Sequence, residues 1–345
     1  MRLIPLIFTC PPGIEDIVEL ELRETFGDIH VDRAPDGVEG RVLADIPEDE
    51  ISRIYSMRSI HHVMMKLRSF QLDTDGDPLS QIYEEIRDAN LSPILPREGK
   101  FRITTERIGV HEFTSIDVQR VAGQAVVDRY GNRVDLENYD VEIRVDVIRE
   151  TCLVGVSLTR ESLHRRGYRV FEHPAALKPT IAYAMIRLGR PEAGMTLVDP
   201  MCGGGTIPIE AALFMGDKLK IYGLDIEESF IKGARRNSEA AGVEGLITLI
   251  KGDCRFLSRF VKNVDLMVTN PPYGVRMEPR FSIGKLYHAF AKEAYRAMRV
   301  GGRLVVITLR GRRMEGALQE AGFSITHKRP VLHGDIKVKV IVAER

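Results

Sequence analysis

The sequence has few cysteines and no closely spaced pair of them. Its four cysteines are Cys10, Cys152, Cys202 and Cys254. Without a Cys-x-x-Cys spacing, the pattern predicts neither a zinc site nor a disulfide framework, and no metal is expected. Unpaired cysteines are typical of proteins in a reducing compartment, so we expect a cytoplasmic location.

The sequence also lacks net charge and long apolar runs. Lys plus Arg and Asp plus Glu each total 49 of the 345 residues, which excludes an overall basic coat but permits a local basic patch. The first apolar run, Leu3–Phe8, is followed by acids at Glu15 and Asp16. That run is too short for a signal peptide or a membrane span, so we expect a buried strand there and no membrane partner. The length suggests two or three domains.

Apolar spacing in the first half of the chain predicts two α+β units. Residues 1–70 show strand and helix patterns in the order β-α-β-β-α-β, which is a ferredoxin-like arrangement. Residues 71–170 show further strands and helices, including one helix with Ile116, Val121 and Val126 predicted to face inward.

A basic segment, "RESLHRRGYRV", ends the second of these units. It places one aromatic ring among four arginines: Arg160, Arg165, Arg166, Tyr168 and Arg169. A charge run is usually a solvated loop. An aromatic residue among arginines is also typical of a nucleic-acid surface, and on these residues alone the two interpretations are about equal.

Three stretches of the same unit resemble a THUMP domain. They are "FRITTERIGVHEFTSIDVQRVAG", "VDLENYDVEIRVDV" and "LHRRGYR", within Lys100 to Arg169. THUMP domains are RNA-binding modules of enzymes that modify tRNA and rRNA. The resemblance therefore implies an RNA partner, with the arginines and the tyrosine of the basic segment as expected contacts.

The last part of the chain has a different pattern. Residues 171–180 are expected to form a linker, and residues 181–345 alternate apolar strands with amphipathic helices. Such repeated units predict a doubly wound, mostly parallel sheet. Ligands bind these sheets at the carboxyl ends of the strands, so residues at strand ends are the candidates for a site.

Acids stand at the ends of three successive predicted strands, at Asp199, Asp225 and Asp253. The first begins the glycine-rich turn "DPMCGGGTIPIEAA". Pro208 replaces the third glycine of a dinucleotide fingerprint and no Walker lysine follows, which argues against dinucleotides and nucleoside triphosphates. Each acid alone is more often a turn residue. Together they favour an adenosine site, with acceptors for the ribose hydroxyls at Asp225 and for the adenine amino group at Asp253.

The fourth predicted strand ends in "VTNPPYG". Taken alone, this is more often a plain strand-ending turn. Together with the glycine-rich turn and the strand-end acids, it resembles the class I (Rossmann-like) S-adenosylmethionine-dependent methyltransferases that act on amino groups. "DPMCGGGT" with "NPPYG", behind THUMP-like and ferredoxin-like regions, resembles one branch in particular. That branch is the tRNA guanine-N2-methyltransferases that make N2-methylguanosine at position 6 of the acceptor stem.

The resemblance implies that S-adenosylmethionine is the cofactor, S-adenosylhomocysteine its product, and tRNA the substrate, with no obligate protein partner. The family's usual Gly-Ser-Gly loop is Gly203-Gly204-Gly205 here, a change not expected to disturb cofactor binding. The expected cofactor-binding residues are Thr180, Asp199, Met201, Cys202, Gly203, Gly205, Thr206, Asp225, Ile226, Asp253, Cys254 and Asn270.

Asn270, Pro271 and Tyr273 are the expected catalytic residues. The exocyclic amine of guanine is a poor nucleophile, because its lone pair is delocalised into the ring. The side-chain oxygen of Asn270 and the main-chain carbonyl of Pro271 can accept its two hydrogens, and the two prolines hold both acceptors rigidly. The ring of Tyr273 can stack on a base that has left its helix.

Several other functions are compatible with part of this pattern. DNA amino-group and protein glutamine methyltransferases carry the NPPY motif, but their substrate-binding regions differ from this front half. A non-catalytic RNA-binding protein predicts decayed motifs, whereas these are intact. Guanine-N2-methyltransferases of large-subunit rRNA and of tRNA guanosine 10 are nearer alternatives, although the latter usually have aspartate where Asn270 stands. The residues alone do not separate tRNA from rRNA.

Overall fold

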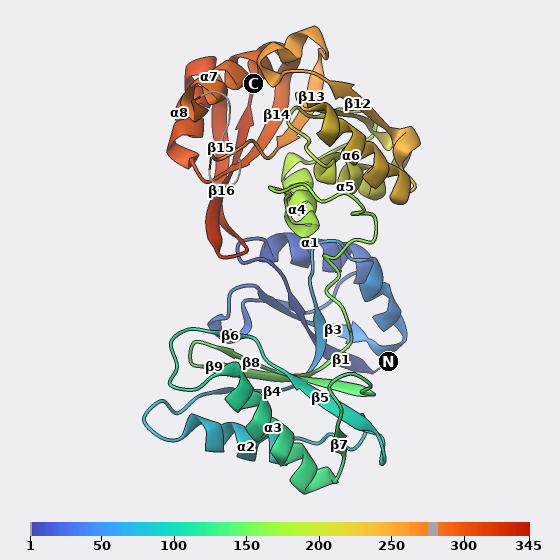
Figure 1. Cartoon of the computed structure of the whole chain (residues 1–345), viewed down its shortest axis with the longest axis vertical. Coiled ribbons are helices and arrows are strands. Elements are labelled where there is room, and N and C mark those ends of the chain that lie inside the picture. Colours follow the sequence, from blue (N-terminus) through green and yellow to red (C-terminus); the bar gives the residue numbers. More distant parts are fainter. Residues whose placement is uncertain (1, 275–281) are drawn as a thin grey trace. The chain divides into compact units, whose positions relative to one another are not determined.

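The chain divides into two compact units, which are described separately (Figure 1). The computed structural model describes residues 2–274 and 282–345. The first unit is formed by Met1–Cys10 with Val18–Leu163, and the second by Pro11–Ile17 with His164–Arg345. The sequence placed the end of the RNA-binding region at residue 170. In the structure the chain passes into the second unit at His164, because the segment after it packs there.

One sheet runs through the whole first unit. The strand order is β2-β3-β1-β4-β9-β8-β5-β7, and β6 pairs with β8. The strands are β1 Leu3–Thr9, β2 Val31–Arg33, β3 Arg41–Pro47, β4 Val63–Gln71, β5 Lys100–Thr104, β6 Arg107–Ile108, β7 Arg133–Val134, β8 Val141–Ile148 and β9 Thr151–Ser157. The antiparallel ladder between β4 and β9 joins the ferredoxin-like and THUMP-like regions, which were expected as two domains.

The helices of this half follow the expected order, with one difference in type. They are α1 Glu15–Phe26, the 3₁₀ helices η1 Pro35–Gly37 and η2 Glu48–Ser56, α2 Pro78–Asp88 and α3 Ser115–Tyr130. The sequence suggested an α-helix where η2 lies. Ile51 and Ile54 are three residues apart, so a helix with three residues per turn places them on one face, and Ile54 is fully buried.

The prediction that Ile116 faces inward was wrong. Ile116 is 74% exposed, whereas Val126 is fully buried and Val121 packs against the core. Ile116 lies in the first turn of α3, which is fixed by a capping box between Thr114 and Asp117. The buried face of α3 begins two residues later, at Val118.

The second unit contains the predicted doubly wound sheet. Its order is β12-β11-β10-β13-β14-β16-β15. The strands are β10 Thr196–Asp199, β11 Lys220–Asp225, β12 Ile247–Lys251, β13 Val264–Thr269, β14 Met298–Thr308, β15 Ser324–His333 and β16 Ile336–Glu344. β10 to β14 pair in parallel, whereas β15 and β16 are antiparallel. The carboxyl ends of five strands therefore meet at one edge of the sheet.

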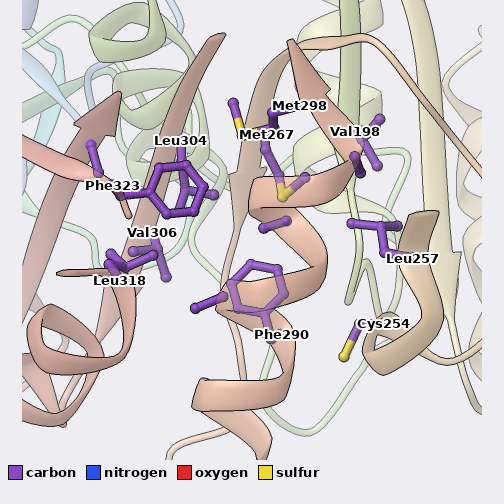
Figure 2. Packing of buried hydrophobic residues seen from close by; sticks show 14 of the residues in the cluster. Val198, Cys254, Leu257, Met267, Phe290, Met298, Leu304, Val306, Leu318 and Phe323 are labelled. Carbon is purple, nitrogen blue, oxygen red and sulfur yellow. The ribbon is translucent and has the colours of Figure 1, made fainter. Parts of the chain in front are cut away.

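Helices cover this sheet and bury its apolar strands. They are α4 Pro179–Gly189, α5 Thr206–Met215, α6 Glu228–Ala240, α7 Ile283–Ala297 and α8 Gly311–Ala321, with the 3₁₀ helices η3 Gly216–Lys218, η4 Glu244–Leu246 and η5 Cys254–Arg259. Phe290 of α7 packs with Met267 of β13 and Val306 of β14 in one core (Figure 2). This core fixes the strand ends that carry the candidate site.

Candidate active site

A cavity of about 280 Å³ opens at the carboxyl ends of the parallel strands in the second unit. The strand order determines how the lining residues are arranged along this edge of the sheet. From one end of this edge to the other, the lining residues are Asp253–Arg255 after β12, Asp225–Glu227 after β11, Asp199–Gly204 after β10, Asn270–Tyr273 after β13, Leu309 after β14, Ile336 and Val338 on β16, and His333 on β15. Acids therefore lie on one side of Asn270, and mostly apolar side chains lie on the other.

The glycine-rich turn between β10 and α5 is held by main-chain contacts. The amide of Cys202 donates to the carbonyl of Leu224 on the neighbouring strand at 2.8 Å. Gly203 and Gly205 have φ angles of 50° and 80°, in the left-handed region that side chains disfavour. A Cβ at Gly205 would lie 3.0 Å from the Cβ of Ala234 on α6, so glycine lets this turn and α6 pack closely.

Asp225 anchors this turn from the end of β11. The residue is 9% exposed, and its carboxylate accepts from the amides of Gly203 at 2.9 Å and Glu227 at 3.0 Å. Burial raises the pKa of the Asp225 carboxyl, and the amide hydrogen bonds partly offset this rise. A carboxylate has about four acceptor positions, so Asp225 can still accept from hydroxyls of a ligand in the cavity.

Asp199 connects β10, β13 and the glycine-rich turn. It is 1% exposed and accepts from the hydroxyl of Thr269 at 2.8 Å and from the amide of Met201 at 3.2 Å. Burial raises the pKa of Asp199 to about 7, and the nearby Asp225 carboxylate acts in the same direction. The charge of this side chain therefore depends on pH near neutrality.

Asp253 lies at the outer end of the acidic side. Its carboxylate accepts from the amide of Arg255 at 2.9 Å and forms an ion pair with the Arg255 guanidinium. Burial alone would raise the pKa of Asp253, but the hydrogen bonds from Arg255 outweigh it and the pKa lies below its ordinary value. A ligand at this position therefore meets an ionised carboxylate together with an arginine.

Asn270 lies directly after β13, in the middle of the cavity lining. Its side-chain nitrogen donates to the carbonyl of Ala175 at 3.4 Å, which turns the side-chain oxygen the other way. That oxygen accepts a hydrogen bond from the hydroxyl of Tyr273. The side-chain oxygen that the sequence assigned to a substrate amine thus accepts from Tyr273 in this structure, which uses one of its two lone pairs.

A buried tyrosine of α7 holds the Asn-Pro-Pro-Tyr loop by a hydrogen bond to its main chain. The hydroxyl of Tyr287, on α7, donates to the carbonyl of Pro272 at 3.1 Å and lies 2.9 Å from the hydroxyl of Thr308. The amide of Arg310 in turn donates to Thr308 at 2.9 Å. Tyr287 is fully buried. These hydrogen bonds connect the carbonyl of Pro272, the residue after Pro271, to the end of β14.

One wall of the cavity is formed by the segment before α4, which the sequence analysis missed. His173, Ala175, Ala176 and Leu177 line the cavity. The sequence predicted only a linker here, since neither apolar spacing nor a known motif distinguishes these residues. The segment also contributes the carbonyl that receives the Asn270 amide.

Most of the other expected cofactor residues line this cavity, but two do not. Met201, Cys202, Thr206, Ile226 and Cys254 belong to the lining. Thr180 is fully buried within α4, and Gly205 packs against α6, so neither belongs to it. The sequence also missed Phe230 on α6 and Leu286 on α7, which do line the cavity.

The predicted basic cluster is divided between the two units. Tyr168 is 6% exposed, and its hydroxyl donates to the buried Glu210 on α5 at 2.8 Å. Arg166 also donates to Glu210, at 3.2 Å. Tyr168 is therefore unavailable to stack on a base, and most of the Arg166 side chain is buried in an ion pair. The buried partner Glu210, which no local pattern revealed, draws both residues inward.

Arg165 remains exposed and Arg169 is partly buried, both in the second unit. The exposed Arg160 belongs to the first unit instead, where a second arginine joins it. The guanidinium carbons of Arg102 and Arg160 lie 5.1 Å and 5.7 Å from the ring centroid of Tyr139. This arginine–tyrosine–arginine cluster was not predicted, because its members are distant in sequence.

Within residues 2–274 and 282–345, no group of three or more metal-binding side chains is found. In the same part of the chain, no helix is both long and apolar enough to span a membrane.

Comparisons with known proteins agree on both units. A family model described as an RMKL-like methyltransferase domain matches residues 166–339, and a THUMP-domain model matches residues 78–157. The tRNA (guanine(6)-N2)-methyltransferase of Archaeoglobus fulgidus is 35% identical, over 97% of this chain and 90% of its own length. The enzyme of that name from Thermus thermophilus is 34% identical, over 98% of each chain. The crystal structure of TrmN from Thermus thermophilus has a TM-score of 0.83 and 32% identity, and the match covers 99% of both chains.

Proposed function

Since the chain belongs to the family of THUMP-domain tRNA guanine-N2-methyltransferases, we propose that it methylates the exocyclic N2 of guanosine 6 in the tRNA acceptor stem. Enzymes of this family use S-adenosylmethionine, whose sulfonium supplies an electrophilic methyl group. The observation that carries the proposal is the position of Asn270 and Pro271, in the cavity lining between the acidic and the apolar side. We further propose that the protein acts in the cytoplasm.

The acidic side of the cavity fits an adenosine ligand. Asp225 keeps acceptor positions for the two ribose hydroxyls after binding the amides of Gly203 and Glu227. Asp253 and Arg255 together offer an acceptor and a donor to a base edge. The glycine-rich turn at Gly203 and Gly204 permits close approach of the backbone. These residues would hold the cofactor beside Asn270.

The opposite side of the cavity is suited to a purine base. Leu309, Ile336 and Val338 provide apolar contacts, and His333 adds one polar side chain. A guanosine within a stem has to leave its stack to reach this side. The ring of Tyr273 offers a stacking surface worth about 1–3 kcal/mol.

In the proposed reaction, the amine of guanine displaces the Tyr273 hydroxyl from the side-chain oxygen of Asn270. Asn270 and the carbonyl of Pro271 then accept the two amine hydrogens, which localises the lone pair on N2. That lone pair forms the new N–C bond while the C–S bond breaks, and the electron pair of the broken bond stays on sulfur. N2 then releases one proton to water.

For RNA docking, the proposal uses Arg102, Tyr139 and Arg160 in place of Arg166 and Tyr168. Two cationic groups beside an aromatic ring can contact a phosphate and an unstacked base. All three residues belong to the unit that carries the THUMP match. Arg165, which is exposed, remains a candidate contact of the second unit.

Single-turnover methylation of tRNA transcripts tests the proposal. We expect label from the cofactor in N2-methylguanosine at position 6, and none at that position in a transcript with adenosine there. Asn270→Ala should lower the rate about 10²- to 10³-fold with little change in binding, because it removes one preorganised acceptor. Label only in rRNA or at guanosine 10 would refute the assigned position. An Asn270→Ala variant with the parent rate would refute the mechanism.

A further inference from the structure

His173 is held with one ring nitrogen directed to its own main chain. Its Nδ1 accepts a hydrogen bond from the amide of Ala175 at 3.1 Å, and the ring meets the Phe230 ring edge-on with centroids 4.2 Å apart. Since Nδ1 is the acceptor, the hydrogen of a neutral ring is on Nε2. Among the described residues, no protein group pairs with Nε2. His173 lines the cavity, so this N–H is available to a ligand.

The ring lies over the glycine-rich turn. The carbon and nitrogen atoms Cδ2 and Nε2 of His173 are 3.2 Å and 3.3 Å from the position a Cβ would take on Gly203. Any side chain at residue 203 would therefore press on the imidazole. Glycine at position 203 therefore permits both the left-handed turn and the close contact with the His173 ring.

The segment that carries His173 is held by contacts with α6 of the same unit. Asn237 on α6 accepts from the amide of Phe171 at 2.8 Å and donates to its carbonyl at 3.0 Å. The same Asn237 amide donates to the carbonyl of Gly204 at 2.9 Å. The Phe171 ring packs so closely on Gly233 that a Cβ there would be 2.2 Å away. These contacts keep the imidazole in place before a ligand binds.

The surroundings of the imidazole favour an anionic group. Thr206 and Ile207, the first two residues of α5, line the cavity beside the turn, and no side chain caps this helix. Main-chain amides at a helix N-terminus attract negative charge. Burial, with the positive charge of Arg169, lowers the pKa of His173, so the ring is a neutral donor at neutral pH. The Arg169 charge itself also favours an anion here.

We infer that His173 binds the carboxylate of the cofactor's amino-acid tail through Nε2–H. This inference rests on the proposed function, because it takes the ligand to be S-adenosylmethionine. Asp225 and Asp253 repel a carboxylate, so the tail requires donors from another part of the wall. The position beside Gly203 is suitable, since a ligand with its ribose at Asp225 passes over the turn after β10.

A pair of ligands and a pair of variants test the inference by calorimetry. S-adenosylhomocysteine carries the amino-acid tail, whereas 5′-methylthioadenosine has the same adenosine and thioether without it. His173→Asn keeps an acceptor for the Ala175 amide but loses the donor at the ε position. This variant should bind S-adenosylhomocysteine about 10- to 100-fold more weakly than the parent, because it loses one charge-assisted hydrogen bond. Its affinity for 5′-methylthioadenosine should equal that of the parent.

His173→Gln places an amide nitrogen near the position of Nε2 and should restore most of the affinity for S-adenosylhomocysteine. Unchanged binding of S-adenosylhomocysteine by His173→Asn would overturn the inference, and so would an equal loss for both ligands. A parent protein that binds the two ligands equally would overturn it as well, while the proposed function would stand. A folded parent that binds neither ligand would refute the proposed function itself.

Discussion

Replacing Tyr287 by phenylalanine tests whether the Tyr287 hydroxyl holds the Asn-Pro-Pro-Tyr loop in its geometry. The substitution removes one hydroxyl from a fully buried ring and leaves the ring in place. That hydroxyl donates to the carbonyl of Pro272 at 3.1 Å and bridges to Thr308 at 2.9 Å. Without it, a partly buried carbonyl loses its donor, which costs about 1–2 kcal/mol.

If this free energy is lost from the loop geometry that the reaction requires, the single-turnover methylation rate falls about 5- to 30-fold. Asn270 and Pro271 are the groups whose geometry changes, so the affinity for S-adenosylhomocysteine should stay within about twofold. The assay is rapid-quench methylation of a tRNA transcript at saturating cofactor, with cofactor binding measured by calorimetry in parallel.

Tyr295→Phe is the matched control, since it removes a hydroxyl from the same helix. The Tyr295 ring contacts Phe323 edge-on and stacks with Arg345, and both contacts depend on the ring alone. This variant should keep the parent rate. A Tyr287→Phe protein with the parent rate, or one that loses rate only in proportion to cofactor affinity, would refute the role of Tyr287 in positioning the loop.

Three other predictions follow from the charges of the structure. Asp225→Ala should weaken cofactor binding about 10- to 150-fold in calorimetry, and unchanged affinity in a folded variant would exclude this site. Arg102→Gln with Arg160→Gln should flatten the log–log salt dependence of tRNA binding by roughly one unit for each lost phosphate contact; the parent slope would place the RNA elsewhere. Burial raises the pKa of Asp199 to about 7, so its contribution to stability is full below the unfolded pKa of about 4 and is lost as pH rises through 7. Relative to Asp199→Asn, the parent should therefore lose on the order of 4 kcal/mol of unfolding free energy between pH 4 and 8 in denaturant titrations, and parallel pH profiles would contradict this.

The sequence predicted the second unit well because its signals are local. Continuous apolar strands separated by helices indicate a parallel sheet, and the acids Asp199, Asp225 and Asp253 stand directly at strand ends. The edge at which they meet follows from the parallel pairing of β10 to β13. Strand-end position alone was therefore enough to assign residues far apart in the chain to one cavity, and all three acids line it.

The basic segment was misjudged because its partner is distant in sequence. Arg166 and Tyr168 resemble a nucleic-acid contact when only their neighbours are considered. Glu210, more than forty residues later, is fully buried and needs donors, and it takes both side chains. A buried carboxylate without partners is costly, so this pairing outweighs the exposure that the charge pattern suggested. The Arg102–Tyr139–Arg160 cluster escaped notice for the same reason, since β5 and two loops bring it together.

The cavity wall includes residues that no sequence motif identifies. Motifs at strand ends supply acceptors, because carboxylates and the Asn270 oxygen are recognisable by type and position. A cofactor with a carboxylate tail also needs donors, and we propose that His173 and the start of α5 supply them. His173 sits in what the sequence indicated as a linker, and its place depends on Asn237 and Gly233 of α6. The segment expected as a linker is therefore part of the second unit, and only its tertiary contacts show that His173 lines the cavity.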